Sequence, residues 1–239
     1  VPVSDAIKIL VNEWMFAGLL TIIAVTTTLG IFGMYIKDFE TKLFADFLTT
    51  AASRLKIQFS YVISALFIGF AMSLVALIIC EIFIVFTGGN LLSLQATLKV
   101  VGILFLSVLL SSTINLFIVL FIKTQSSFST VSTIIGSAIG FLCGIYVPMS
   151  SLPSYVQSIV HYFPISHIAV LLRETFMAES INEVFQGNAA AADSYKTTFG
   201  VMYEINGSIV SNTTSVLFIC GTIVILGCVS LYIFTRKHK

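Results

Sequence analysis

Polar side chains within or beside long apolar runs are the first candidates for chemistry in this sequence. Glu81 and Asn115 each lie inside such a run. Ionisable and amide groups are costly inside a membrane, so they commonly mark ion, proton or substrate pathways. Glu81 is a candidate proton or substrate site, although a position at the membrane surface would simply expose it to water. For Asn115, a hydrogen bond between two helices is the simpler role.

Soluble-enzyme chemistry has no recognisable motif here. The sequence contains no G-x-x-x-x-G-K-[ST] phosphate loop, no H-E-x-x-H and no G-x-S-x-G. His161 and His167 flank Pro164, but a metal site there would need a third ligand, so we expect amphipathic residues at a membrane surface and no metal. The cysteines lie in apolar runs without metal or redox spacing. We therefore expect no catalytic residues.

The composition indicates an integral membrane protein. Of 239 residues, 57% are hydrophobic and 10% are charged, and the mean hydropathy is +1.04. A soluble domain carries about 25% charged residues. Twelve Lys and Arg residues against 11 Asp and Glu residues give a net charge of +1. This balance lacks the basic surface that a nucleic-acid partner would require.

Several stretches are long enough to cross a bilayer, which takes about 20 mainly apolar residues. They are continuous rather than alternating, so we predict an all-α polytopic protein instead of a barrel. The predicted spans are residues 15–36, 57–86, 100–122, 130–147 and 213–234. The fourth belongs to a longer uncharged run, in which Pro148 stops the helix.

Basic residues orient these spans, because Lys and Arg concentrate in cytoplasmic loops. One set of loops contains Lys37, Lys42, Arg54, Lys56, Lys123, Arg236, Lys237 and Lys239. The other set contains Lys8, Lys99, Arg173 and Lys196. The first set is therefore predicted to be cytoplasmic, with the carboxyl end inside and residues 148–212 outside. An odd number of spans suggests that a sixth, amino-terminal helix is missing, the alternative being a five-span protein with its amino end outside.

The segment between the first two spans has the pattern of an amphipathic helix. Phe39, Leu43, Phe47 and Leu48 recur at helical spacing within residues 38–54. Such a helix could lie passively among lipid headgroups. It could instead dock into a groove on a cytoplasmic partner. The periodicity leaves both interpretations open.

Proline residues predict an irregular structure after the fourth span. Pro148 and Pro153 interrupt the helix, and Pro164 separates two short helical stretches. The result would be an external re-entrant or interfacial hairpin, followed by an outer loop, over residues 150–212. Irregular backbone at membrane depth occurs only where protein or a wet cavity surrounds it. Within the fourth span, Gly136, Gly140 and Gly144 form a stripe against which a neighbouring helix could pack closely.

The stretch from Gly144 to Arg173 resembles the signature region of ABC-2 type transporter permeases. The residues that carry the resemblance are Gly144, Tyr146, Pro148, Leu152, Pro153, Pro164 and Arg173, in that order. Asp38-Phe-Glu-Thr-Lys and Ala52-Ser-Arg54 also look like the first cytosolic loop of that family. With the spans in register, the resemblance covers nearly the whole chain.

This resemblance implies a type V exporter-like bundle of six helices, which fits a missing first span. Residues 37–56 would then contain the coupling helix that a separate ABC ATPase subunit receives. Its implied coupling surface is Asp38, Phe39, Glu40, Phe47 and Arg54. ATP and Mg²⁺ would bind to that partner, and this chain would hold no cofactor. Two permeases, identical or homologous, and two ATPases would form the working unit, and the re-entrant helices would close the pathway from outside.

We therefore expect an exporter permease for an amphipathic, lipid-like, drug or peptide substrate. It would be a multi-pass protein in the lipid of a bacterial plasma membrane. The candidate pathway or gate residues are Glu81, Asn115, Pro148, Pro153, Pro164 and Arg173. One alternative is an ion-coupled secondary transporter or channel that uses Glu81. Another is a non-transporting immunity or assembly subunit that binds a ligand through the outer segment, residues 178–212.

Overall fold

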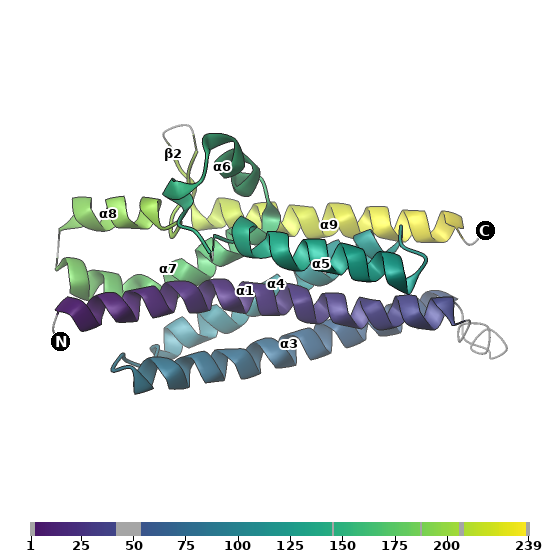
Figure 1. Ribbon diagram of the computed structural model, residues 1–239, viewed down its shortest axis with the longest axis horizontal. Helices are drawn as coiled ribbons and strands as arrows, with labels where there is room; N and C mark the ends of the chain where they lie inside the picture. Colours follow the sequence, from purple (N-terminus) through teal and green to yellow (C-terminus); the bar gives the residue numbers. More distant parts are fainter. Residues whose placement is uncertain (1–2, 42–53, 145, 187, 206–207, 238–239) are drawn as a thin grey trace.

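Long helices lie side by side, roughly along the long axis of the molecule (Figure 1). The structure is a computed structural model and describes residues 3–41, 54–144, 146–186, 188–205 and 208–237. The long helices are α1 (Val3–Glu40), α3 (Arg54–Phe86), α4 (Leu94–Val119), α5 (Gln125–Leu142) and α9 (Asn212–Lys237). The shorter elements are a 3₁₀ turn (Met149–Ser151), α6 (Ser154–His161), α7 (Pro164–Phe185), α8 (Ala189–Thr198) and the strands β1 (Glu204–Ile205) and β2 (Ser208–Ile209). The predicted all-α polytopic architecture is confirmed, with one antiparallel pair of two-residue strands added.

Four described helices are long and apolar enough to cross a membrane, namely α1, α3, α4 and α9. The pair α6 and α7 passes the same test jointly, but it is bent by 86° at the break between them. This bend has the form expected for a broken span or a re-entrant hairpin. In contrast, α5 is not among the four, and its first turn is polar (Gln125-Ser-Ser). The exact set of spans stays a prediction.

Two helix boundaries differ from the predicted ones, because polar groups form hydrogen bonds that the local sequence does not predict. The first helix begins at Val3 rather than near Met15. The helix predicted over residues 130–147 lies at Gln125–Leu142, because Thr124 caps its start by accepting the N–H of Ser127. It ends before Gly144, whose φ of +62° leaves the helical conformation.

The segment predicted as a separate helix over residues 38–54 begins differently. Asp38, Phe39 and Glu40 belong to the last turn of α1, and Arg54 is the first residue of α3. Residues 42–53, including Phe47, lie outside the described residues. The expectation of a helix starting at residue 38 is thus wrong at its start, because α1 continues through Glu40.

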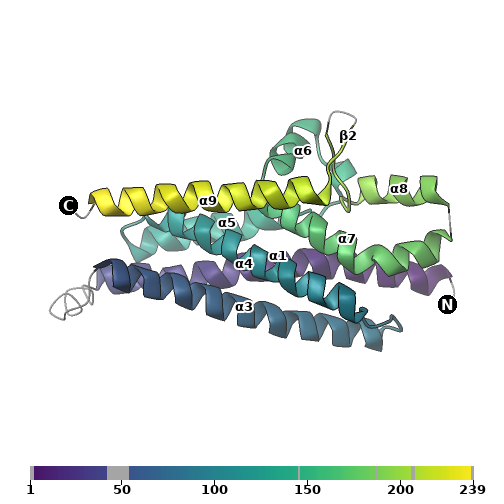
Figure 2. The ribbon, with the colours of Figure 1, turned by 180° about the vertical axis from the view of Figure 1, so that it is seen from behind.

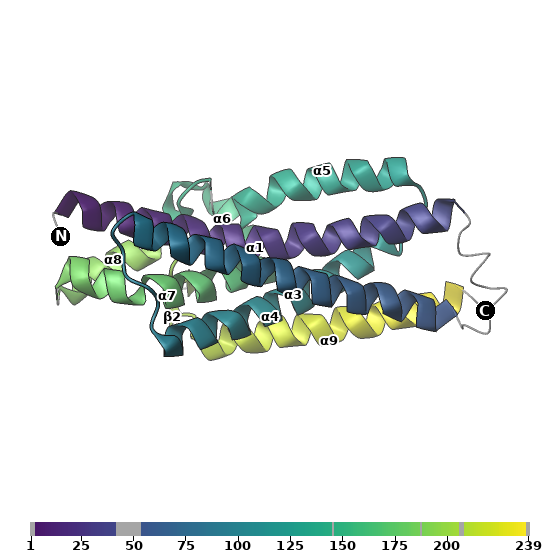
Figure 3. The same ribbon diagram turned by 90° about the horizontal axis from the view of Figure 1, so that it is seen from below.

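Helix α1 occupies the centre of the bundle and packs against α3, α4, α5 and α7. Figure 3 shows it lying between α5 and α3. We call the end that carries α6 and α8 the hairpin end, and the opposite end, with Lys37, Lys56 and Lys123, the basic end. The core has one large cluster toward the hairpin end and a second, around Phe32 and Phe128, toward the basic end.

The outward faces of α3 and α9 are apolar and exposed, as lipid-facing helices require. Phe67 on α3 and Leu217 on α9 are among the most exposed of these large side chains. In Figure 2, α9 lies along α4 on the side of the bundle away from α1.

Candidate functional site

Arg173 on α7 organises the hairpin end. Its side chain is 2% exposed. Its Nη2 donates to the carbonyl oxygens of Cys143 (2.8 Å) and Gly144 (2.9 Å), and its Nη1 donates to that of Gly200 (3.4 Å). These carbonyls lie just beyond the carboxyl ends of α5 and α8, where helix dipoles place partial negative charge. Among the described residues, no carboxylate pairs with Arg173.

Two glycines make room for the guanidinium. Gly144 and Gly200 have φ values of +62° and +65°, the left-handed conformation that glycine adopts most easily. A Cβ on either residue would lie 3.5 Å from Nη1 of Arg173. The two ends of the resemblance signature, Gly144 and Arg173, are therefore in direct contact.

Trp14 brings α1 into the same cluster. The central guanidinium carbon of Arg173 lies 4.7 Å from the centroid of the Trp14 ring, within cation–π range. The indole Nε1 donates to the carbonyl of Phe199 at 2.7 Å. We call Trp14, Cys143, Gly144, Arg173 and Gly200 the arginine hub. Sequence reasoning missed Trp14, although a lone tryptophan at the start of an apolar run was an available signal.

Two acidic side chains lie at the hairpin end. Glu13 is 6% exposed, and its Oε1 accepts a hydrogen bond from Ser180 on α7 at 2.7 Å. Glu81, a predicted pathway residue, is half-buried, and its Oε2 accepts the N–H of Leu92 at 3.1 Å. Glu81 thereby holds the loop between α3 and α4, which gives it a structural task besides any role in a pathway.

Asn115 joins α4 to α1 in the interior of the bundle. Its amide is 1% exposed and donates to the carbonyl of Val25 (3.0 Å) and to Oγ1 of Thr28 (2.9 Å). Thr28 in turn donates to the carbonyl of Ala24 at 2.8 Å. This arrangement is a hydrogen bond between helices of the kind expected from the sequence.

Replacing Asn115 with leucine is expected to lower the free energy of unfolding by about 0.5–2 kcal/mol, the range for such bonds in membranes. The cause is the loss of both amide hydrogen bonds to α1. Thermal unfolding of the purified protein in detergent measures the change. The matched control is Thr113→Val, because Thr113 donates only within its own helix, to Leu109. Equal melting temperatures for the two variants would contradict a bracing role for Asn115.

At the basic end, the last turn of α1 is attached to two other helices. Oε2 of Glu40 accepts the N–H of Gln125, the first residue of α5, at 2.7 Å. A carboxylate at a helix amino end also interacts favourably with the helix dipole. Asp38 accepts a hydrogen bond from the hydroxyl of Tyr61 on α3, while Phe39 is exposed. Of the predicted coupling residues, the structure thus brings Asp38 and Glu40 into contacts within the bundle.

The remaining predicted site residues shape the hairpin. Pro148 precedes the 3₁₀ turn, Pro153 precedes α6, and Pro164 is the first residue of α7. His167 on α7 uses both ring nitrogens in hydrogen bonds, to the carbonyl of His161 (2.9 Å) and to the Ser215 hydroxyl on α9 (3.0 Å). The hairpin is thereby attached to α9.

The glycine stripe on α5 divides into different environments. Gly140 packs against the ring of Tyr146, and Gly144 belongs to the arginine hub. A Cβ on Gly136 would meet no described atom within 4 Å. The expected packing of a neighbouring helix at Gly136 therefore stays a prediction.

The chain matches the family described as ABC-2 type transporter over residues 4–177. The match runs from the start of α1 into α7 and so includes Trp14, Gly144 and Arg173. No curated protein matches the chain. The chain belongs to the ABC-2 type transporter family, as its signature predicted, and it is a multi-pass membrane permease component of an ABC transporter.

Proposed function

We propose that this chain is the permease of an exporter driven by a separate ATPase subunit, which binds ATP and Mg²⁺. The basic end would face the cytoplasm and the ATPase, in keeping with the distribution of Lys and Arg. The transporter would use two permeases and move an amphipathic substrate, such as a lipid-like molecule, drug or peptide, out of a bacterial cell. The site's residues would transmit the conformational change, while ATP hydrolysis belongs to the partner.

The continuity of α1 is the observation that supports this proposal most. One helix carries Asp38, Phe39 and Glu40 at the basic end and Trp14 in the arginine hub at the other. Glu40 contacts the start of α5, and Arg173 holds the end of α5. A displacement of residues 38–40 by an ATPase would therefore reach both ends of α5 and the hairpin.

The alternatives receive less support from the described contacts. An ion-coupled transporter that uses Glu81 receives less support, because Oε2 of Glu81 already accepts the N–H of Leu92 and thereby holds the loop between α3 and α4. An immunity or assembly subunit would need an outer segment that is free to bind. Instead, Phe199 and Gly200, at the end of α8, are bonded to Trp14 and Arg173. These contacts attach the end of α8 to the bundle.

A photo-crosslinking residue at position 39 tests the ATPase contact. With benzoylphenylalanine in place of Phe39, illumination of native membranes should give a covalent product that contains a phosphate-loop ATPase subunit. The matched control places the same residue at Leu91, an exposed apolar position at the hairpin end, where no such product is expected. Mass spectrometry of the product identifies the partner.

Equal crosslinking from both positions would contradict a contact at the basic end. If no ATPase subunit is crosslinked or co-purified in mild detergent, the proposal of a separate ATPase is wrong.

A further inference from the structure

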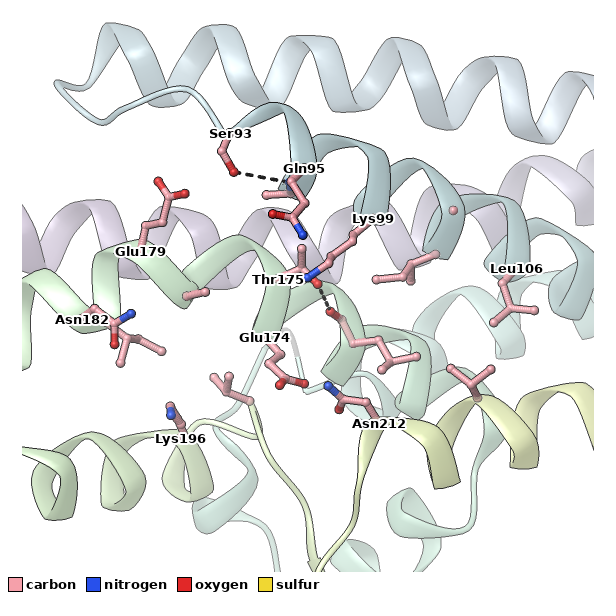
Figure 4. A pocket seen from close by; sticks show the side chains of 18 residues that line it. Ser93, Gln95, Lys99, Leu106, Glu174, Thr175, Glu179, Asn182, Lys196 and Asn212 are labelled. Atoms are coloured by element: carbon pink, nitrogen blue, oxygen red, sulfur yellow. Dashed lines mark hydrogen bonds between the residues drawn. The ribbon is translucent and has the colours of Figure 1, made fainter.

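A cavity of about 700 Å³ opens at the hairpin end between α4, α7, α8 and α9 (Figure 4). This volume is in the range of small-molecule sites. The cavity shares no lining residue with the arginine hub, and the transmission path along α1 and α5 does not use it. It needs a separate explanation.

One part of the cavity wall is apolar. Ile103 and Leu106 come from α4, Leu171 from α7 and Val216 from α9. These helices are close together there, because α4 packs against both α7 and α9. Side chains of this kind can cover an alkyl chain, and removing that chain from water favours binding.

Another part of the wall is polar and carries both signs of charge. Lys99 on α4 and Glu174 on α7 extend into the cavity, with Asn212 near Glu174 (Figure 4). Neither Lys99 nor Glu174 forms an ion pair with another described residue. Lys196 also lines the cavity, but its ammonium lies 3.6 Å from the carboxylate of Asp193. The cavity therefore offers one cation, Lys99, and two carboxylates, Glu174 and Glu179, that form no ion pair with another described residue.

The position of these charges along α4 suits a molecule at the membrane surface. Lys99 lies in the second turn after the helix begins at Leu94, and Leu106 lies two turns deeper. A ligand with its polar group beside Lys99 and its chain toward Leu106 would have the orientation of a lipid in the adjacent leaflet.

We propose that this cavity binds a zwitterionic amphiphile, with its anionic group on Lys99, its ammonium group on Glu174 and its chain against Ile103, Leu106 and Val216. Both a resident membrane lipid and a transported substrate can have this chemistry. The proposal depends on the chain being embedded in a membrane. It does not depend on the ATPase, so the two proposals can fail separately.

Gly102 offers a way to fill the cavity. It lines the cavity, and a Cβ at this position would meet no atom of a described residue within 4 Å. Binding of lysophosphatidylethanolamine to the full-length protein, purified with its accompanying subunits, is measured by native mass spectrometry and calorimetry. Gly102→Leu should weaken binding about tenfold or more, which corresponds to about 1.4 kcal/mol. The matched control is Gly221→Leu on α9. A Cβ at Gly221 also meets no described atom within 4 Å, and Gly221 does not line the cavity. This variant should bind as the parent protein does.

The two charges are tested separately with a second ligand, the anionic lysophosphatidylglycerol. Lys99→Gln should weaken binding of both lipids several-fold, because both carry a phosphate. Glu174→Gln should weaken only the ethanolamine lipid, because only this lipid carries an ammonium. Unchanged affinity in Gly102→Leu, or equal effects of Glu174→Gln on both lipids, would overturn the proposal.

The source of the ligand is decided in vesicles that contain the assembled transporter. If the site receives substrate, ATP should drive movement of labelled lysophosphatidylethanolamine, and Gly102→Leu should abolish it. If the site holds a resident lipid, binding should persist without ATP-driven movement. Both results support a zwitterionic site and assign its source.

Discussion

Replacing Arg173 with methionine is expected to lower the free energy of unfolding by about 3 kcal/mol. Methionine fills part of the same volume, but it leaves the carbonyls of Cys143, Gly144 and Gly200 without their donor. Each buried acceptor without a partner costs about 1–3 kcal/mol. The lost cation–π contact with Trp14 adds about 1 kcal/mol. Removing the buried charge of Arg173 recovers its desolvation cost and offsets part of this destabilisation.

The stability of this variant is measured by thermal unfolding in detergent, followed by circular dichroism. Lys99→Met is the matched control, because it removes a cation from the same end of the bundle without breaking a described hydrogen bond. Arg173→Lys should fall between the parent and Arg173→Met, since lysine keeps the charge but cannot span both helix ends with a planar fork. If Arg173→Met melts at the same temperature as Lys99→Met, other contacts hold the ends of α5 and α8.

Replacing Gly33 with leucine is expected to separate α1 from α5. A Cβ at Gly33 would lie 2.5 Å from Cε1 of Phe128, which belongs to the same buried cluster as Phe32 and Ile36. Overpacking of this kind costs about 1–3 kcal/mol. The larger expected effect is on transport, because Phe128 and the bond from Gln125 to Glu40 join the two helices near the basic end.

Gly30→Leu is the matched control on the same helix, since a Cβ at Gly30 would meet no atom within 4 Å in the described part of the chain. ATP-driven transport in vesicles and thermal unfolding are compared for both variants. Phe128→Ala should partly restore Gly33→Leu by removing the ring that the new side chain meets. Normal transport by Gly33→Leu would show that close packing of α1 on α5 is not needed for coupling.

The sequence predicted the main elements because their signals are local. Each long helix corresponds to an apolar run, and the prolines at 148, 153 and 164 mark the turns around α6 and α7. The signature from Gly144 to Arg173 identified the family before any contact was known. The same signature predicts Arg173 as a site residue.

The remaining features depend on partners far away along the chain. Glu13 and Trp14 precede the predicted first span, but they form hydrogen bonds with Ser180 and with the backbone of Phe199, and α1 continues through both. The hydrogen bond from Gln125 to Glu40 also cannot be predicted from a local sequence pattern. The cavity lined by Lys99 and Glu174 exists only once α4 and α7 are adjacent.

The attachment of α5 to α1 near both ends has a mechanical consequence. Two antiparallel helices that are joined at one contact can pivot against each other. Helices that are joined near both ends resist sliding and move together as one rigid unit. Glu40 and Phe128 join α1 and α5 near the basic end, and Arg173 with Trp14 joins them at the arginine hub. Helix α9 packs chiefly on α4 and α7 and is not part of this pair of helices. A small tilt of α1 at the basic end would therefore be transmitted by α1 and α5 together to the hairpin. Relative movement within the bundle would occur mainly between this pair and α9.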